Sequence, residues 1–191
     1  MANHVTSSIR INGTKELIDK VEEMFNHEKG GKKFEMKTEW LAKTVYDEYD
    51  WQTTPIGAKW CYLDDECRES DNEYYFTTVS AWSAPIDYLK KLTEVLVAID
   101  DSTTIECTYQ DEMPNFVGAF YGSKNGVVDR EDEPDDRPDE EDFEDEDGEI
   151  DDYAYDDAVD SYYYGLDDLT QEILEDIKYE IDGESEATET I

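Results

Sequence analysis

Apolar and polar residues alternate at the start of the chain, which predicts a half-buried β-strand. Val5, Ile9 and Ile11 share one face of this strand, while Thr6 and Arg10 lie on the other. From Thr14, a favourable N-cap residue, the apolar residues recur instead at helical spacing. The chain is therefore expected to begin with a strand and an amphipathic helix.

The same patterns predict five further elements. We expect a hairpin of two strands rich in aromatic and β-branched residues at 57–65 and 73–82. A second helix is expected at 86–99, and two more strands at 103–110 and 115–122. Residues 32–56 are ambiguous between a short helix and irregular structure and are interpreted as an insertion. The order β-α-β-β-α-β with one further strand predicts an α+β, ferredoxin-like split βαβ fold, in which two helices cover one face of an antiparallel sheet.

A last helical pattern over residues 166–183 carries an apolar stripe. The stripe consists of Leu166, Leu169, Ile173, Ile177 and Ile181, and acidic residues occupy the other faces. Such a helix needs a surface to pack on: the sheet, a second copy of the chain in a homodimer, or the target. Residues 184–191 are expected to form a disordered tail.

The acidic residues are far more numerous than solubility requires, and they are unevenly placed. The 191 residues include 53 Asp and Glu against 16 Lys and Arg, a net charge of −37. Residues 1–127 hold 23 acidic and 13 basic side chains, whereas residues 128–191 hold 30 and 3. We therefore predict an α+β domain over residues 1–127 and an acidic, tyrosine-containing segment over residues 128–165. Most of that segment should be extended and solvated by itself.

The charge and the apolar runs also bear on partners and compartment. A surface this acidic repels nucleic acids and anionic membranes and attracts basic proteins. The opening MANHVTSSIR lacks the apolar core of an export signal, and no run of 18 apolar residues occurs, so we expect a cytoplasmic protein. Cys61, Cys67 and Cys107 are odd in number and are interpreted as reduced packing residues.

The sequence contains no recognisable catalytic or metal-binding pattern. A nucleophilic Cys or Ser needs a base nearby, and His4 and His27 are the only histidines. Cys61 and Cys67 are further apart than the cysteines of a typical zinc pair, and Asp145–Gly148 does not fit the spacing of a calcium loop. We therefore expect no enzyme activity, no metal and no cofactor.

Several motifs of the first 127 residues suggest a family. They are Lys59-Trp60, Trp82 followed by Pro85, Tyr109 ahead of Asp111-Glu112, and Phe116 with Gly118. In these motifs the chain resembles the YubB-type ferredoxin-like domains of unknown function that plasmids and bacteriophages encode. The resemblance covers roughly residues 2–127 and implies a fold and a mobile-element origin, with no settled activity.

The residues expected to bind a partner lie in the acidic segment. Tyrosine is a frequent anchor at interfaces, and carboxylates supply the charge. The candidates are Asp135, Asp136, Asp139, Glu140, Glu141, Asp142, Glu144, Asp145, Glu146, Asp147, Asp151, Asp152, Tyr153, Tyr155, Asp156, Asp157 and Tyr163.

Two functions are consistent with these residues. The first is a phage or mobile-element protein that imitates a nucleic acid and inhibits a basic host protein, either a nucleic-acid-binding enzyme or a defence complex. The second is an acidic adaptor or chaperone-like protein that binds a basic partner without competing with nucleic acid. In neither case does the protein bind nucleic acid or membrane directly.

Overall fold

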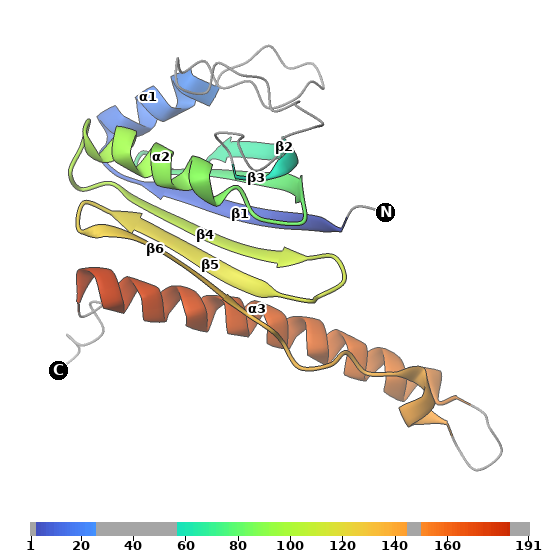
Figure 1. The fold of residues 1–191 in the computed structure, drawn as a ribbon. Helices are drawn as coiled ribbons and strands as arrows, with labels where there is room; N and C mark the ends of the chain where they lie inside the picture. Colours follow the sequence, from blue (N-terminus) through green and yellow to red (C-terminus); the bar gives the residue numbers. More distant parts are fainter. Residues whose placement is uncertain (1–2, 26–56, 145–149, 184–191) are drawn as a thin grey trace.

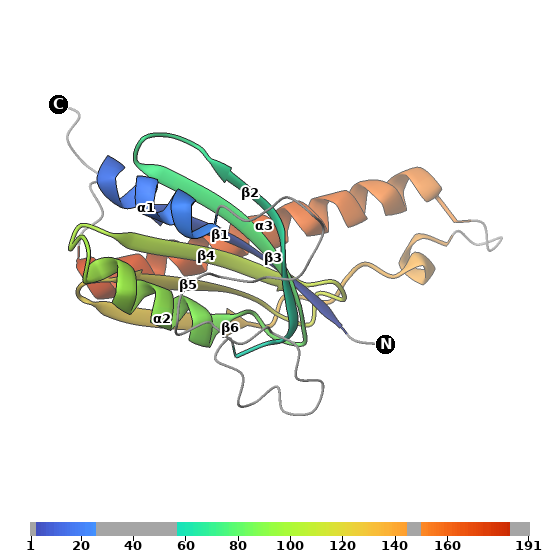
Figure 2. The same cartoon turned by 90° about the horizontal axis from the view of Figure 1, so that it is seen from above.

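The described part of the chain folds around an antiparallel sheet with helices on both faces, an α+β arrangement (Figures 1 and 2). This computed structural model describes residues 3–25, 57–144 and 150–183. The six strands of the sheet have the order β2-β3-β1-β4-β5-β6, with every neighbouring pair antiparallel. The elements are β1 (His4–Asn12), α1 (Lys15–Phe25), β2 (Lys59–Arg68), β3 (Glu73–Ala81), α2 (Ile86–Val97), β4 (Thr104–Asp111), β5 (Val117–Ser123), β6 (Gly126–Asp132), the short 3-10 helix η3 (Glu140–Phe143) and α3 (Asp152–Asp182).

The first face of the sheet is covered by α1 and α2, as the sequence predicts (Figure 2). The odd-numbered apolar residues of β1, Val5, Ile9 and Ile11, are fully buried in this core. Leu89 and Leu92 of α2 are buried in the same core. The predicted N-cap of α1 is confirmed, because the hydroxyl oxygen of Thr14 accepts a 3.4 Å hydrogen bond from the backbone N–H of Leu17. The period-two and helical patterns thus located this layer correctly.

The second face is partly covered by α3, which crosses β4, β5 and β6 (Figure 1). The predicted apolar stripe is confirmed: Leu166, Ile173 and Ile177 are buried against Val117 and Tyr121 of β5, with Leu169 and Ile181 partly buried beside them. The strand β5 is therefore buried on both faces, and every one of its residues is buried. Of the three surfaces considered for this helix, the sheet is the one that it packs on.

Two elements differ from the sequence-based expectation. The sheet continues into β6, so a boundary at residue 127 falls inside a strand, and the backbone of Asp129–Asp132 is paired with β5 although the side chains are exposed. The Asn125-Gly126 pair is a hairpin signal, and Gly126 has a φ of +151°, a conformation that side chains disfavour. β6 is also tied to both layers: Asp129 pairs with Lys90 of α2 at 2.9 Å, and Arg130 pairs with Glu180 of α3 at 2.8 Å.

The last helix begins at Asp152, fourteen residues before the predicted start at Leu166. Asp151 caps it, because its carboxylate accepts a 3.1 Å hydrogen bond from the backbone N–H of Ala154. Gly165 directly precedes Leu166, the first buried residue of the helix, and a Cβ added at Gly165 would meet nothing within 4 Å. The expected insertion at 32–56 and the expected tail at 184–191 lie outside the described residues.

The C-terminal end of α3 is fixed to the sheet through Asp182. Its carboxylate accepts hydrogen bonds from the hydroxyl of Ser123 and the amide of Asn125, both at 2.8 Å, and from the hydroxyl of Tyr121. Partial burial tends to raise the pKa of Asp182, but these hydrogen bonds outweigh it and the pKa is lowered. Burial and the hydrogen bond to Asp182 both raise the pKa of Tyr121.

Replacement of Asp182 by Asn should therefore make stability less dependent on pH in acid. A carboxylate with a lowered pKa stabilises the fold above its unfolded pKa, about 4, and this stabilisation is lost as the pH falls through the folded pKa. The difference in melting temperature between the parent chain and Asp182→Asn should be present at pH 7 and shrink towards pH 3. The exposed Asp156→Asn variant removes the same charge and is the control. A difference that stays constant over this range would contradict the prediction.

Candidate functional site

The most acidic part of the molecule projects beyond the sheet as an arm. We define the acidic arm as residues 133–144 together with residues 150–165, the first half of α3. Figure 1 shows the two segments running side by side away from the sheet, on the side where α3 begins. Arg137 is the only basic residue in this arm.

Aromatic contacts hold the two segments of the acidic arm together. The rings of Phe143 and Tyr155 meet edge to face, with centroids 5.7 Å apart. Glu144 and Ile150 form an isolated β-bridge, and the backbone N–H of Asp151 donates a 3.0 Å hydrogen bond to the carbonyl of Phe143. The acidic arm is thus a folded hairpin-like unit, although its composition alone predicts a solvated chain. These aromatic side chains provide the packing that the acidic residues cannot.

The predicted carboxylates fall into three groups, all of them exposed where described. Asp135 and Asp136 belong to the extended part of the acidic arm, and Asp151, Asp152, Asp156 and Asp157 belong to the start of α3. Asp139, Glu140, Glu141, Asp142 and Glu144 surround η3, where Asp139 caps the turn by accepting a 3.3 Å hydrogen bond from the N–H of Glu141. Asp145, Glu146 and Asp147 lie outside the described residues.

The acidic surface extends further along α3 than the candidate residues did. Beyond Asp157, the exposed face of the helix carries Asp160, Asp167, Asp168, Glu172 and Glu175. These residues could have been found from the sequence, because they occupy the helix positions that the apolar stripe leaves free. The candidate surface is therefore a continuous acidic face along α3 with the second acidic segment beside its first half.

The three predicted tyrosine anchors have different surroundings. Tyr153 is 82% exposed, whereas Tyr155 is half-buried against Phe143 and serves the packing of the acidic arm. Tyr163 lies beneath Arg137, whose guanidinium carbon is 5.9 Å from the ring centroid. Tyr164, which was not predicted, is 74% exposed and lies three helical turns from Tyr153 on the same side of α3. Tyr153 and Tyr164 are thus the two most accessible aromatic groups of this surface.

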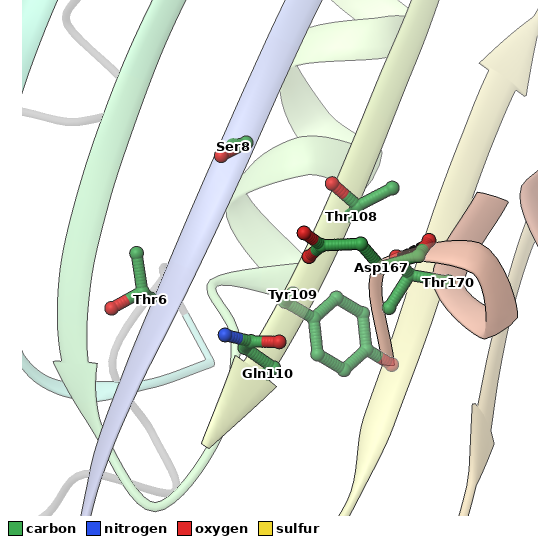
Figure 3. Close-up of a pocket in the computed structure, with 7 residues that line it drawn as sticks. All are labelled: Thr6, Ser8, Thr108, Tyr109, Gln110, Asp167 and Thr170. Atoms are coloured by element: carbon green, nitrogen blue, oxygen red, sulfur yellow. Dashed lines mark hydrogen bonds between the residues drawn. The ribbon is translucent and has the colours of Figure 1, made fainter. Parts of the chain in front are cut away.

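A polar hollow lies where the edge of α3 meets the uncovered part of the sheet (Figure 3). It has a volume of about 100 Å³. Asp167 reaches from α3 across β4 towards β1, as Figure 3 shows. The lining residues are Thr6 and Ser8 of β1, Thr108, Tyr109 and Gln110 of β4, and Asp167 and Thr170 of α3.

The family-like motifs of the first 127 residues form two clusters. Trp60 and Trp82 lie 5.4 Å apart between ring centroids, and the ammonium of Lys59 is 4.4 Å from the Trp60 ring and 5.2 Å from the Trp82 ring. Both tryptophans have a positive φ, +52° and +66°, which is strained for such side chains. This tryptophan pair belongs to β2 and to the end of β3, at the sheet edge opposite β6.

The second cluster supports the turn between β4 and β5. Asp111 is buried and accepts backbone hydrogen bonds from Met113 at 3.1 Å and from Asn115 at 2.8 Å. The Tyr109 ring packs against Phe116 and lies so close to Gly118 that a side chain there would collide with it. These motifs therefore have a structural role in this chain.

The described residues carry neither a metal-binding cluster nor a membrane-spanning helix. Over 3–25, 57–144 and 150–183, no group of three or more His, Cys, Asp or Glu side chains is arranged to hold a metal ion. Among these residues, no helix combines the length and the apolar character needed to cross a bilayer. Cys61 and Cys107 are buried free thiols, and burial raises the pKa of Cys61 to about 12.

In comparisons with known proteins, no family model, no curated protein and no solved structure matches this chain. The resemblance to YubB-type domains therefore stays a prediction that rests on the sequence motifs.

Proposed function

We propose that this protein imitates a nucleic acid and thereby inhibits a basic host protein that binds DNA or RNA. The observation that carries the proposal is the exposed acidic face that runs along α3. In the acidic arm a second acidic segment lies beside this face, and Arg137 is the only cation of the arm. A groove built to hold phosphates would bind such a surface, because carboxylates attract the same Lys and Arg side chains. The proposal requires no catalytic residue.

The density of charge on α3 supports this proposal. The helix has 31 residues, eleven of them acidic and one, Lys178, basic. At about 1.5 Å per residue it is about 46 Å long, so it carries an acidic group every ~4 Å. One strand of DNA carries a phosphate every ~3.4 Å. The carboxylates of α3 are thus spaced nearly as closely as the phosphates that a nucleic-acid-binding groove contacts.

The acidic arm adds a second line of charge beside the first. Eight carboxylates of residues 133–144 run next to the first half of α3, to which Phe143 and Arg137 attach them. Tyr153 and Tyr164 present flat rings on the same surface, and an arginine that stacks on nucleobases would also stack on these rings. The combination of charge and rings supports binding of a nucleic-acid groove rather than simple solubility.

The rest of the chain is proposed to be a scaffold for this surface. The element order of β1, α1, β2, β3, α2 and β4, with neighbouring strands in the order β2-β3-β1-β4, supports the proposal that they form a ferredoxin-like unit. We propose that β5, β6 and α3 extend such a unit. A plasmid or phage origin, as the YubB-type resemblance implies, would place the protein in the cytoplasm of the host cell.

An adaptor function is the second candidate, and the tryptophan pair favours it. Trp82 is 42% exposed and lies with Trp60 at the sheet edge opposite β6, away from the acidic face. Two separate surfaces on one small protein suit a molecule that joins two partners. In that case the acidic face would hold a basic partner while its nucleic-acid site stays accessible.

A competition experiment separates the two functions. The protein is used to capture a partner from host lysate, the partner is eluted with salt and purified, and its labelled DNA or RNA is bound to it. If the protein is a mimic, adding it should displace the nucleic acid completely, with an inhibition constant equal to its own Kd for the partner. A ternary complex with unchanged nucleic-acid affinity would exclude mimicry and leave the adaptor function.

A further inference from the structure

The polar hollow beside α3 contains a carboxylate without a cation. Asp167 is exposed, and within the described residues no basic side chain pairs with it. The two cations that α3 and β6 place nearby are engaged elsewhere: Lys178 pairs with Glu106 at 3.1 Å, and Arg130 pairs with Glu180 at 2.8 Å. The hollow therefore lacks internal charge compensation.

The remaining lining groups are rich in hydrogen-bond acceptors. The hydroxyl oxygens of Thr6 and Thr108 and the side-chain carbonyl of Gln110 can accept hydrogen bonds, and the hydroxyl oxygen of Ser8 already accepts one from the hydroxyl of Tyr75 at 3.3 Å. The hydroxyl of Thr170 is already used, because it donates a 2.8 Å hydrogen bond to the backbone carbonyl of Asp167. A ligand for this hollow should thus be positively charged and should present several N–H donors in different directions.

The size of the hollow indicates how such a ligand is delivered. About 100 Å³ is well below the roughly 300–1,000 Å³ of a typical small-molecule site, but it can hold the head group of one side chain. A guanidinium group is planar, always charged and has five N–H donors with no acceptor, which suits one carboxylate surrounded by hydroxyls. A compact ammonium, with three donors, would leave more of the acceptors unused.

We propose that this hollow is a binding site for a single arginine side chain of a protein partner, with Asp167 as its ion-pair partner and Thr108 and Gln110 as hydrogen-bond acceptors. The proposal rests on the proposed function only for the identity of the partner, which is the same basic protein. The acidic face of α3 borders the hollow on one side, so an approaching basic surface is attracted there, and the hollow fixes its position. General attraction and one specific contact are thereby combined on one helix.

The test uses a blocked Gly-Arg-Gly peptide and the full chain, observed by ¹H–¹⁵N correlation spectra. Saturable shifts are expected at the backbone amides of Thr108, Gln110 and Asp167. The same peptide with citrulline, the uncharged analogue of arginine, should not produce them. Asp167→Asn should weaken peptide binding by about tenfold or more, because it removes a charged hydrogen-bond acceptor.

Asp168→Asn is the matched control. It removes the same charge from the neighbouring residue of the same exposed helix face but does not line the hollow, so binding should stay near the parent value. Equal losses in the two variants, or shifts spread over the acidic arm without saturation at Thr108 and Gln110, would overturn the arginine site. Because the peptide assay needs neither the partner nor nucleic acid, its outcome is independent of the competition experiment that tests the proposed function.

Discussion

A variant with six arm carboxylates replaced by their amides should bind the captured partner at least about tenfold more weakly at low salt, and its affinity should depend less on salt. The replaced residues are Glu140, Glu141, Asp142, Glu144, Asp156 and Asp157. Amides keep the side-chain size, and the capping residues Asp139 and Asp151 are left unchanged. Each lost contact with a basic groove removes the release of about one counterion, which is the source of the salt dependence.

The control for this prediction removes six charges elsewhere. Glu16, Glu23, Asp64, Asp87, Glu94 and Asp101 are exposed and lie outside the acidic arm and α3. Their amide variants have the same net charge as the arm variant, so long-range attraction is matched. Binding measured from 50 to 200 mM salt should distinguish the two variants. The same loss in both would show that only the total charge matters and that the acidic arm is not the interface.

Replacement of Ile177 by Ala should lower the free energy of unfolding by about 2–5 kcal/mol. Ile177 is fully buried between α3 and the sheet, in the core that includes Val117 and Tyr121 of β5. The loss has two parts: the free energy gained by burying the removed hydrocarbon groups away from water, and the cost of the cavity that they leave. It can be measured by urea unfolding followed by circular dichroism.

Tyr179→Ala provides the comparison on the same helix. Tyr179 is 62% exposed and should change the unfolding free energy far less. If Ile177→Ala is as mild as Tyr179→Ala, α3 does not contribute a core of its own. In that case the acidic part would be an appendage to an independently stable sheet, as the charge distribution alone suggests.

The first layer of the fold was predictable because its sequence signals are strong. Val5, Ile9 and Ile11 alternate with polar residues, and Leu89, Leu92 and Leu96 recur at helical spacing, so burial on one face leaves a clear period. β6 was missed because only Gly126 and Val128 are partly buried, and its last four residues, Asp129–Asp132, are exposed and charged. Asn125-Gly126 was the available signal, and it was hidden by the acidic stretch that follows.

The first half of α3 and the polar hollow were less accessible to sequence reasoning. Residues 152–165 carry only a weak apolar stripe, of which Tyr155 packs against Phe143 in an acidic neighbour segment and Tyr162 packs against the core between α3 and the sheet. The hollow combines Ser8, Thr108 and Asp167, which are far apart in the chain and meet only in the folded sheet. The acidic character of the surface was predictable from composition, but its arrangement along a helix depends on these tertiary contacts.

Gly165 has a consequence for how this protein evolves. All the buried residues of α3, from Leu166 to Ile177, follow it, whereas no residue from Asp152 to Gly165 is buried. Substitutions of the buried residues after Gly165 are constrained by packing, whereas most substitutions of exposed residues before it change stability by less than about 0.5 kcal/mol. The acidic arm can therefore accumulate mutations and follow a changing partner over generations, while the sheet and the second half of α3 preserve the fold that carries it.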